Sequence, residues 1–186
     1  MSRERPIIFA GWTVRAILDG RKTQTRRIVK PTVKGCTVGT YSDSARGPYE
    51  CVNVGDDGDP IDAPVIACPY GVPGDRLWVR ETFYEDASAA VGVVYKADSD
   101  ARKKPLWTGP WSPSIFMPRD ASRLTLEITA VRVERLTDIT GPDAYAEGLI
   151  GHDPETDFVA GFRRMLKLKA DADPWVWVIT FRRTES

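Results

Sequence analysis

The chain has 186 residues, 42% of them hydrophobic, which is enough to bury the core of a single domain. Its 26 Lys and Arg residues balance 26 Asp and Glu residues, so no overall positive field attracts nucleic acid and any such contact needs a local patch. The N-terminus lacks an apolar signal segment and no stretch reaches the roughly 20 apolar residues that span a bilayer, so we expect a cytoplasmic protein without membrane contact.

The first predicted elements are a strand over residues 7–9 and a short helix over residues 14–18. Thr13 is the predicted N-cap of this helix, and Gly20 lies where a left-handed residue would end it. The next strand is expected over residues 23–29.

Residues 20–27, which end this helix and begin this strand, carry four cations, two hydroxyls and an amide. A solvated basic turn is the ordinary explanation of such a cluster. Thr23 and Thr25 alternate with the charged residues, however, and a merely solvated turn does not need that arrangement. We therefore interpret the turn as a candidate site.

Residues 31–70 are rich in Gly, Pro and Asp, and we interpret them as an insertion that forms a hairpin or a long loop with its turn at residues 56–58. Three cysteines and the single histidine also bear on metal chemistry: Cys36, Cys51, Cys68 and His152. They could form a zinc site, but no closely spaced cysteine pair is present, so we favour free thiols and expect neither a metal nor another cofactor.

A further strand is predicted over residues 77–83, with Glu81 on one face and Trp78 followed by Arg80 on the other. Another strand is expected over residues 91–97. The basic and aromatic loop over residues 98–118 can either stack a nucleotide base or pack back onto the domain.

The second half of the chain predicts a long strand over residues 122–136, whose apolar face switches after Ala130, as at a β-bulge. A short helix follows, capped by Thr140 and ended by Gly148. Two final elements are expected: a helix over residues 156–168 with Phe158, Phe162, Met165 and Leu166 as its apolar stripe, and a strand over residues 175–181 whose aromatic residues belong to the core.

Four stretches carry a resemblance to a known family: residues 20–27 with the pattern Gly-Arg-Lys-Thr-x-Thr-x-Arg, and residues 74–81, 144–149 and 175–181. The chain resembles the ASCH domains, relatives of the PUA RNA-binding fold, in the longer form often carried by phages and prophages. The resemblance implies one α+β domain over residues 1–186. Its expected core is a small, mostly antiparallel PUA-like β-barrel with about three flanking helices.

The resemblance also implies a catalytic set. Bacterial ASCH amidohydrolases that deacylate N4-acetylcytidine use a lysine, a threonine and a distant glutamate, which Lys22, Thr25 and Glu147 match. The residues expected to bind the substrate are Arg21, Thr23, Arg26, Arg27, Trp78, Arg80 and Glu81.

The same chemistry is plausible on physical grounds. A threonine hydroxyl needs a base within hydrogen-bond reach, and Lys22 can serve if burial and neighbouring arginines lower its pKa. Glu147 alone would be an ordinary exposed helix carboxylate, and Glu81 is the rival carboxylate for the same role, unless it forms a salt bridge instead.

Three hypotheses for function follow. The first is a metal-independent amidohydrolase acting on an N4-acylcytosine nucleoside or a related modified base. The second is a non-catalytic RNA-binding module that uses the same basic cleft, and the third is a ribonuclease. The balanced net charge favours a small substrate over a long polyanion.

Overall fold

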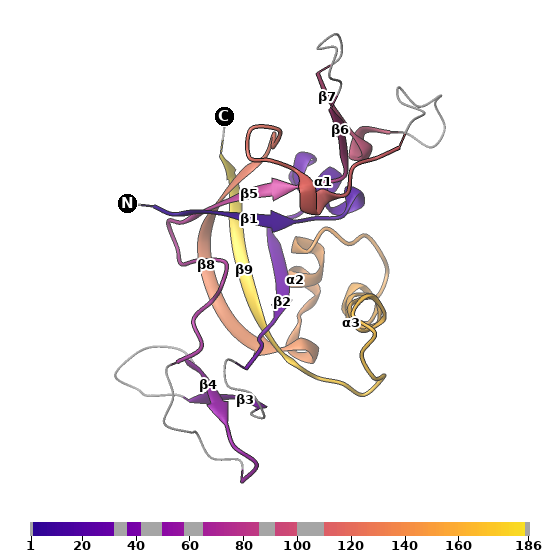
Figure 1. Cartoon of the computed structure of the whole chain (residues 1–186). Helices are drawn as coiled ribbons and strands as arrows, with labels where there is room; N and C mark the ends of the chain where they lie inside the picture. Colours follow the sequence, from indigo (N-terminus) through magenta and orange to yellow (C-terminus); the bar gives the residue numbers. More distant parts are fainter. Residues whose placement is uncertain are drawn as a thin grey trace.

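The computed structural model describes residues 2–31, 37–41, 50–57, 65–85, 92–99 and 110–184. These residues form an α+β fold with one five-stranded mixed sheet, two separate hairpins and three α-helices (Figure 1). The strands are β1 (Glu4–Ile8), β2 (Gln24–Ile28), β3 (Thr37–Tyr41), β4 (Glu50–Val54), β5 (Arg76–Arg80), β6 (Phe83–Glu85), β7 (Val93–Tyr95), β8 (Thr125–Arg135) and β9 (Trp175–Thr184). The α-helices are α1 (Gly11–Leu18), α2 (Gly141–Ala146) and α3 (Pro154–Met165).

The five-stranded sheet has the order β1-β5-β8-β9-β2. Its two outer strands come from the N-terminal part of the chain, and only β1 and β5 are parallel. β1 and β2 do not pair with each other within the described residues, so the sheet is open there and the predicted closed barrel is not confirmed. The β3–β4 and β6–β7 hairpins form sheets of their own.

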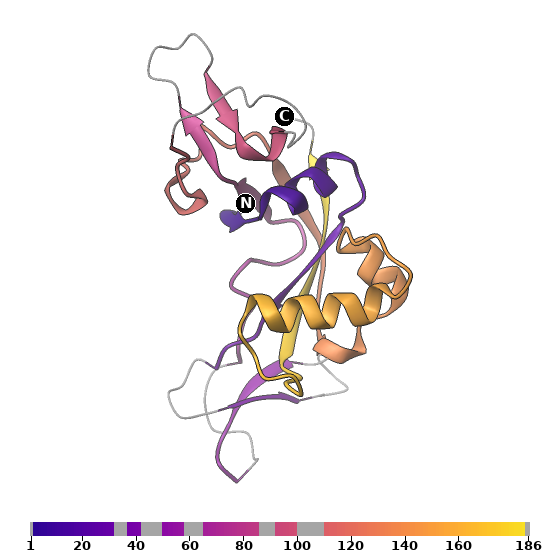
Figure 2. The same ribbon diagram turned by 90° about the vertical axis from the view of Figure 1, so that its right-hand side faces the viewer.

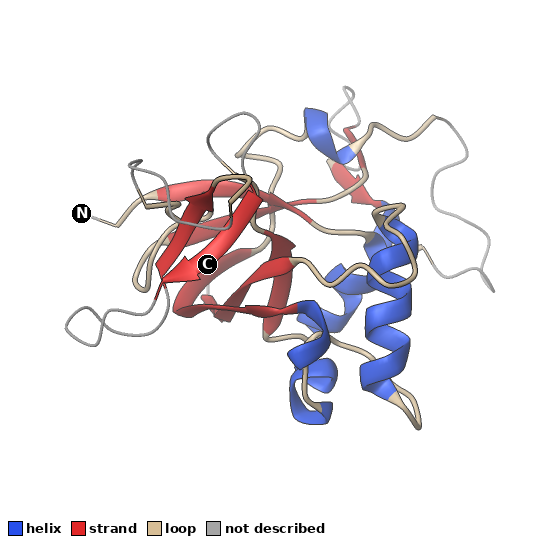
Figure 3. Cartoon of the chain, turned by 90° about the horizontal axis from the view of Figure 1, so that it is seen from below, coloured by secondary structure: helices blue, strands red, loops and turns tan. Residues whose placement is uncertain are grey.

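Both faces of β9 are buried, which explains its nearly continuous apolar sequence. Trp177, Ile179 and Phe181 face a large core shared with β1, α1, β5 and β8. Val176 and Val178 face the opposite way, against Phe162 of α3. Helix α3 accordingly crosses that face of the sheet beside β2 (Figure 2), and the helices lie mostly to one side of the strands (Figure 3).

Several predicted elements are confirmed. Gly20 adopts a positive φ of 73° directly after the C-cap of α1, and Thr140 caps α2 through a bond that its hydroxyl accepts from the Asp143 N–H. The β-bulge in β8 lies between Ile128 and Ala130. The switch of face comes one residue earlier than predicted, because Ala130 is exposed.

Other details of the predicted elements are wrong. Helix α1 begins at Gly11, so Thr13 lies inside its first turn and its hydroxyl donates to the Ala10 carbonyl instead of capping the helix. The strand expected over residues 77–83 ends at Arg80, and Phe83 begins β6.

The predicted insertion does contain a hairpin, β3–β4, but the turn at Asp56 and Asp57 follows its second strand instead of joining the two strands. Residue 58, at the end of that predicted turn, lies outside the described residues. Helix α3 begins two residues earlier than expected and ends at Met165, which is 64% exposed. Phe158 and Phe162 therefore make up the packed part of its apolar stripe.

Among the described residues, no helix has the length and apolar character needed to cross a bilayer.

Candidate active site

The position of Lys22 is set by the end of α1. The Lys22 N–H donates to the Ala16 carbonyl at 2.9 Å, and the residue pairs with Glu147 in an isolated antiparallel bridge. The regular strand β2 starts two residues later, at Gln24. Lys22 therefore lies before the regular alternation of β2, and it lines the same cavity as Thr25.

Gly148 allows the end of α2 to approach Lys22 closely. The residue has a φ of 90°, and a Cβ built on it would lie 2.8 Å from the Cβ of Ala16 and 3.1 Å from the Cβ of Lys22. Any larger residue would both strain the backbone and push α2 away from the turn. The Gly148 that was predicted to end α2 therefore also holds Glu147 in place.

The ammonium group of Lys22 is fully surrounded by acceptors. Its Nζ donates to the Gln24 carbonyl at 2.7 Å, to the Glu147 carbonyl at 2.9 Å and to Oε2 of Glu147 at 2.5 Å. The side chains of both charged residues are at most 5% exposed. The ordinary interpretation of Glu147 as an exposed helix carboxylate is thus wrong: it is the partner of a buried lysine.

The environment of Lys22 lowers its pKa below the ordinary value of 10.5. Burial is the main cause, because it removes water from the charged form, and the nearby cations Arg27 and Arg26 act in the same direction. Glu147 opposes this shift through its charge and its hydrogen bond. Cation repulsion therefore contributes as the sequence predicted, but desolvation is the larger effect.

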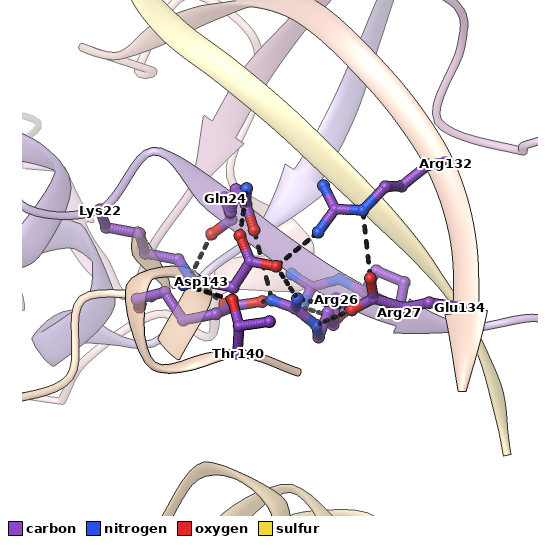
Figure 4. A network of polar contacts seen from close by, with 9 residues as sticks. Lys22, Gln24, Arg26, Arg27, Arg132, Glu134, Thr140 and Asp143 are labelled. Atoms are coloured by element: carbon purple, nitrogen blue, oxygen red, sulfur yellow. Dashed lines mark hydrogen bonds and ion pairs between the residues drawn. The ribbon is translucent and has the colours of Figure 1, made fainter. Parts of the chain in front are cut away.

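Arg26 joins the same network from the centre of β2. Its side chain is completely buried and forms ion pairs with Glu134 at 2.6 Å, Asp143 at 3.1 Å and Glu147 at 3.3 Å. Arg132 bridges the first two of these carboxylates from β8 (Figure 4). The strand register explains the meeting, since Arg26 and Arg132 both lie opposite Val178 of β9.

The charges of this network balance. Three cations, Lys22, Arg26 and Arg132, are paired with three carboxylates, Glu134, Asp143 and Glu147. Arg27 is the additional cation beside them. It donates to the backbone carbonyls of Arg26 and Ile8, lies over the ring of Phe9, and forms no ion pair within the described residues.

Thr25 stands apart from this network. It is only 1% exposed, yet its hydroxyl makes no hydrogen bond with any described residue. The residue lines a first cavity together with Lys22 and Glu147.

That first cavity measures about 90 Å³ and combines polar residues with aromatic ones. Its aromatic lining comes from the residue directly after β1 and from α1 and α3: Phe9, Trp12, Phe158 and Phe162. Trp12 is 51% exposed and lies at the border with solvent. A volume of this size holds a group of a few heavy atoms, about that of three water molecules.

A second cavity of about 270 Å³ adjoins the first. The two share Arg26, Arg27, Phe162 and Met165, and the second is further lined by Lys30 and Tyr70, among others.

The other residues expected to bind the substrate lie away from both cavities. Arg21 and Thr23 are exposed, and Arg21 pairs with Asp19. Trp78 and Arg80 stack on each other on β5. None of these four residues lines either cavity.

Glu81 is buried, as expected for a carboxylate that faces inward, but its partner is Arg123 at 2.9 Å. Arg123 also binds Asp98, so it joins the segment before β8 to the 3₁₀ turn after β7. Burial raises the pKa of Glu81, and Arg123 opposes that change. Of the two rival carboxylates, it is Glu147 that contacts Lys22.

Sequence reasoning missed Gln24, Arg132, Glu134 and Asp143 in the network and Trp12 in the cavity. Gln24 lies inside the motif over residues 20–27 and Trp12 lies shortly before it, so both could have been considered from the sequence. The other three depend on strand register.

The described residues contain no group of three or more His, Cys, Asp or Glu side chains that could hold a metal ion. Cys68 is a free thiol, whereas Cys36 and the side chain of Cys51 lie outside what the structure describes.

We compared the chain with protein-family models, with curated proteins and with solved structures, and none of the three comparisons gives a match. The resemblance to the ASCH domains consequently rests on the sequence motifs themselves.

Proposed function

We propose that the protein is a metal-independent amidohydrolase of the ASCH type that removes the acyl group from an N4-acylcytosine nucleoside or a related modified base. The PUA-like fold of that family is part of the proposal. The observation that carries it is the buried Lys22–Glu147 pair, which lines one cavity together with Thr25.

In the first half of the proposed reaction, the Thr25 oxygen attacks the carbonyl carbon of the acyl group. Lys22 must be neutral to accept the hydroxyl proton, and its short contact with Glu147 gives its own proton a route to that carboxylate. The tetrahedral intermediate collapses when the carbon–nitrogen bond breaks. Lys22 then protonates the departing cytosine amine, which leaves an acyl ester on Thr25.

In the second half, water attacks this ester while Lys22 takes a proton from it. The ester bond breaks, the carboxylic acid departs, and the Thr25 oxygen recovers its proton. Two nitrogens of the Arg27 guanidinium donate to backbone carbonyls, which leaves further N–H groups for the negatively charged oxygen in both halves.

RNA binding and ribonuclease action are less well supported. Lys22 and Arg26 are buried and fully paired, so the dense basic turn of the sequence offers few free cations to a phosphate backbone. The aromatic lining of the first cavity suits part of a small neutral base better than a phosphate backbone.

The test is to incubate the purified protein with N4-acetylcytidine and to follow the formation of cytidine by ultraviolet absorbance. We expect turnover by the parent protein and a loss of about 10²–10⁴-fold in Lys22→Met and Glu147→Gln. The matched control is Glu81→Gln, which removes the charge of another buried carboxylate outside the cavity and should retain turnover. Absence of turnover in the parent, together with salt-sensitive binding of RNA, would favour the binding module.

A further inference from the structure

The second cavity contains chemistry that the proposed deacylation does not use. Lys30 and Tyr70 line it together with Arg27, and the rest of its lining is largely apolar, with Ile28 and Leu166 among the residues. Lys30 is exposed and forms no ion pair within the described residues.

The charge of this cavity differs from that of the network beside it. Lys22, Arg26 and Arg132 are matched by carboxylates, but Arg27 and Lys30 are not matched within the part of the chain that the structure describes. No Asp or Glu is among the residues that line the second cavity. The cavity therefore has a net positive lining, and a bound anion would meet no acidic side chain there.

The two cavities are adjacent, because four residues line both of them. The first offers aromatic rings to a planar base next to Lys22 and Thr25, with the half-exposed Trp12 at its edge. A ligand that places part of its base in the first cavity would have its remaining groups on the side of Arg27 and the second cavity. A ribose against the apolar lining and a phosphate near Lys30 would fit this order of chemical groups.

We propose that the substrate of this site is a phosphorylated nucleoside, whose phosphate binds Lys30 and Arg27 in the second cavity. This inference rests on the proposed function for the identity of the base. Two of the three residues that define the phosphate subsite, Lys30 and Tyr70, have no part in the deacylation, whereas Arg27 serves both. A phosphate bound between an ammonium, a guanidinium and a phenol hydroxyl is held by charge-assisted hydrogen bonds.

The test measures binding without turnover. Dissociation constants for cytidine, cytidine 5′-monophosphate and cytidine 3′-monophosphate are determined by calorimetry for the parent protein, Lys30→Gln and Lys96→Gln. Lys96 is an exposed lysine of the 3₁₀ turn after β7 and lines neither cavity, so it is the matched control.

We expect one of the two monophosphates to bind the parent about tenfold or more tightly than cytidine, since a hydrogen bond to a charged group has about that effect. Lys30→Gln should reduce this ratio several-fold, whereas Lys96→Gln should keep it. Preference for the 5′-phosphate would identify a mononucleotide, and preference for the 3′-phosphate would identify the backbone of an RNA strand.

Equal binding of cytidine and both monophosphates by the parent would overturn the proposal, as would an unchanged ratio in Lys30→Gln. Because cytidine and its phosphates have no amide to cleave, this result does not depend on catalysis. A protein that prefers the phosphates but never hydrolyses N4-acetylcytidine would refute the proposed function and retain the phosphate subsite.

Discussion

Lys22 is a buried lysine with two opposing influences on its proton. Desolvation and the arginines favour the neutral amine, while Glu147 at 2.5 Å favours the ammonium. A group held between these influences can exchange a proton with a substrate more readily than a solvated lysine of pKa 10.5.

The activity should therefore depend on pH through Lys22. We expect kcat/KM for N4-acetylcytidine to rise with pH and to level off at an apparent pKa below 10.5, since only the neutral amine accepts the Thr25 proton. Arg27→Gln removes one cation that lowers the Lys22 pKa, so the rise of kcat/KM should move toward higher pH in this variant. If kcat/KM of the variant rises at the same pH as that of the parent, a group other than Lys22 controls the pH dependence.

The same residue should affect stability. Because the folded-state pKa of Lys22 lies below 10.5, the unfolded chain binds more protons between the lowered value and 10.5. The free energy of unfolding should rise with pH through that window from this group alone. Urea denaturation at several pH values should show this rise in the parent relative to Lys22→Met; parallel curves would contradict it.

Trp12 offers a residue-scale test of the first cavity. Its ring is half exposed and adjoins the cavity, so stacking on a planar base would stabilise the complex by about 1–3 kcal/mol. Trp12→Ala should raise KM about tenfold or more with little change in kcat, measured by steady-state kinetics. An unchanged KM would place the base elsewhere.

At the scale of elements, the site depends on the approach of α2 to the turn after α1. Gly148→Ala should cost about 1–3 kcal/mol of stability and also separate Glu147 from Lys22, since its new Cβ would meet Ala16 and Lys22. Gly20→Ala is the matched control: Gly20 also has a positive φ, but no atom lies within 4 Å of an added Cβ.

We expect Gly20→Ala to lose about 1 kcal/mol from backbone strain alone and to keep its activity. Thermal denaturation and turnover of the two variants check this. Equal losses of activity would mean that the packing of Gly148 has no special role in the site.

For the molecule as a whole, many individual elements could be predicted from the sequence. The turn at Gly20, the caps of α2 and the aromatic strand β9 follow from local patterns, and the structure confirms them. The pairing of Lys22 with Glu147 was expected only through a resemblance, because 125 residues separate them.

The rest required long-range pairing that a local pattern does not contain. Arg26 meets Glu134 and Arg132 because β2 and β8 both pair with β9 in one register. Trp78 and Arg80 of β5, which were proposed to bind the substrate, line neither cavity. Alternation gives the face of a strand but not its neighbours in space.

The balanced charge of the whole molecule also has a measurable consequence. Within the described residues, the network is neutral and the unmatched cations of the two cavities are Arg27 and Lys30. We therefore expect the logarithm of the binding constant for a cytidine monophosphate to fall with the logarithm of salt concentration by a slope no steeper than about 2. A slope of 5 or more with a longer RNA would indicate a broad basic surface instead.

The most direct measurement of the central claim compares Thr25→Ser with Thr25→Val in the hydrolysis of N4-acetylcytidine. The hydroxyl has no partner among the described residues, so valine replaces threonine with nearly the same shape and little loss of stability. We predict that serine retains turnover and that valine loses about a thousandfold or more of kcat. Equal turnover in the two folded variants would contradict the assignment of Thr25 as the nucleophile.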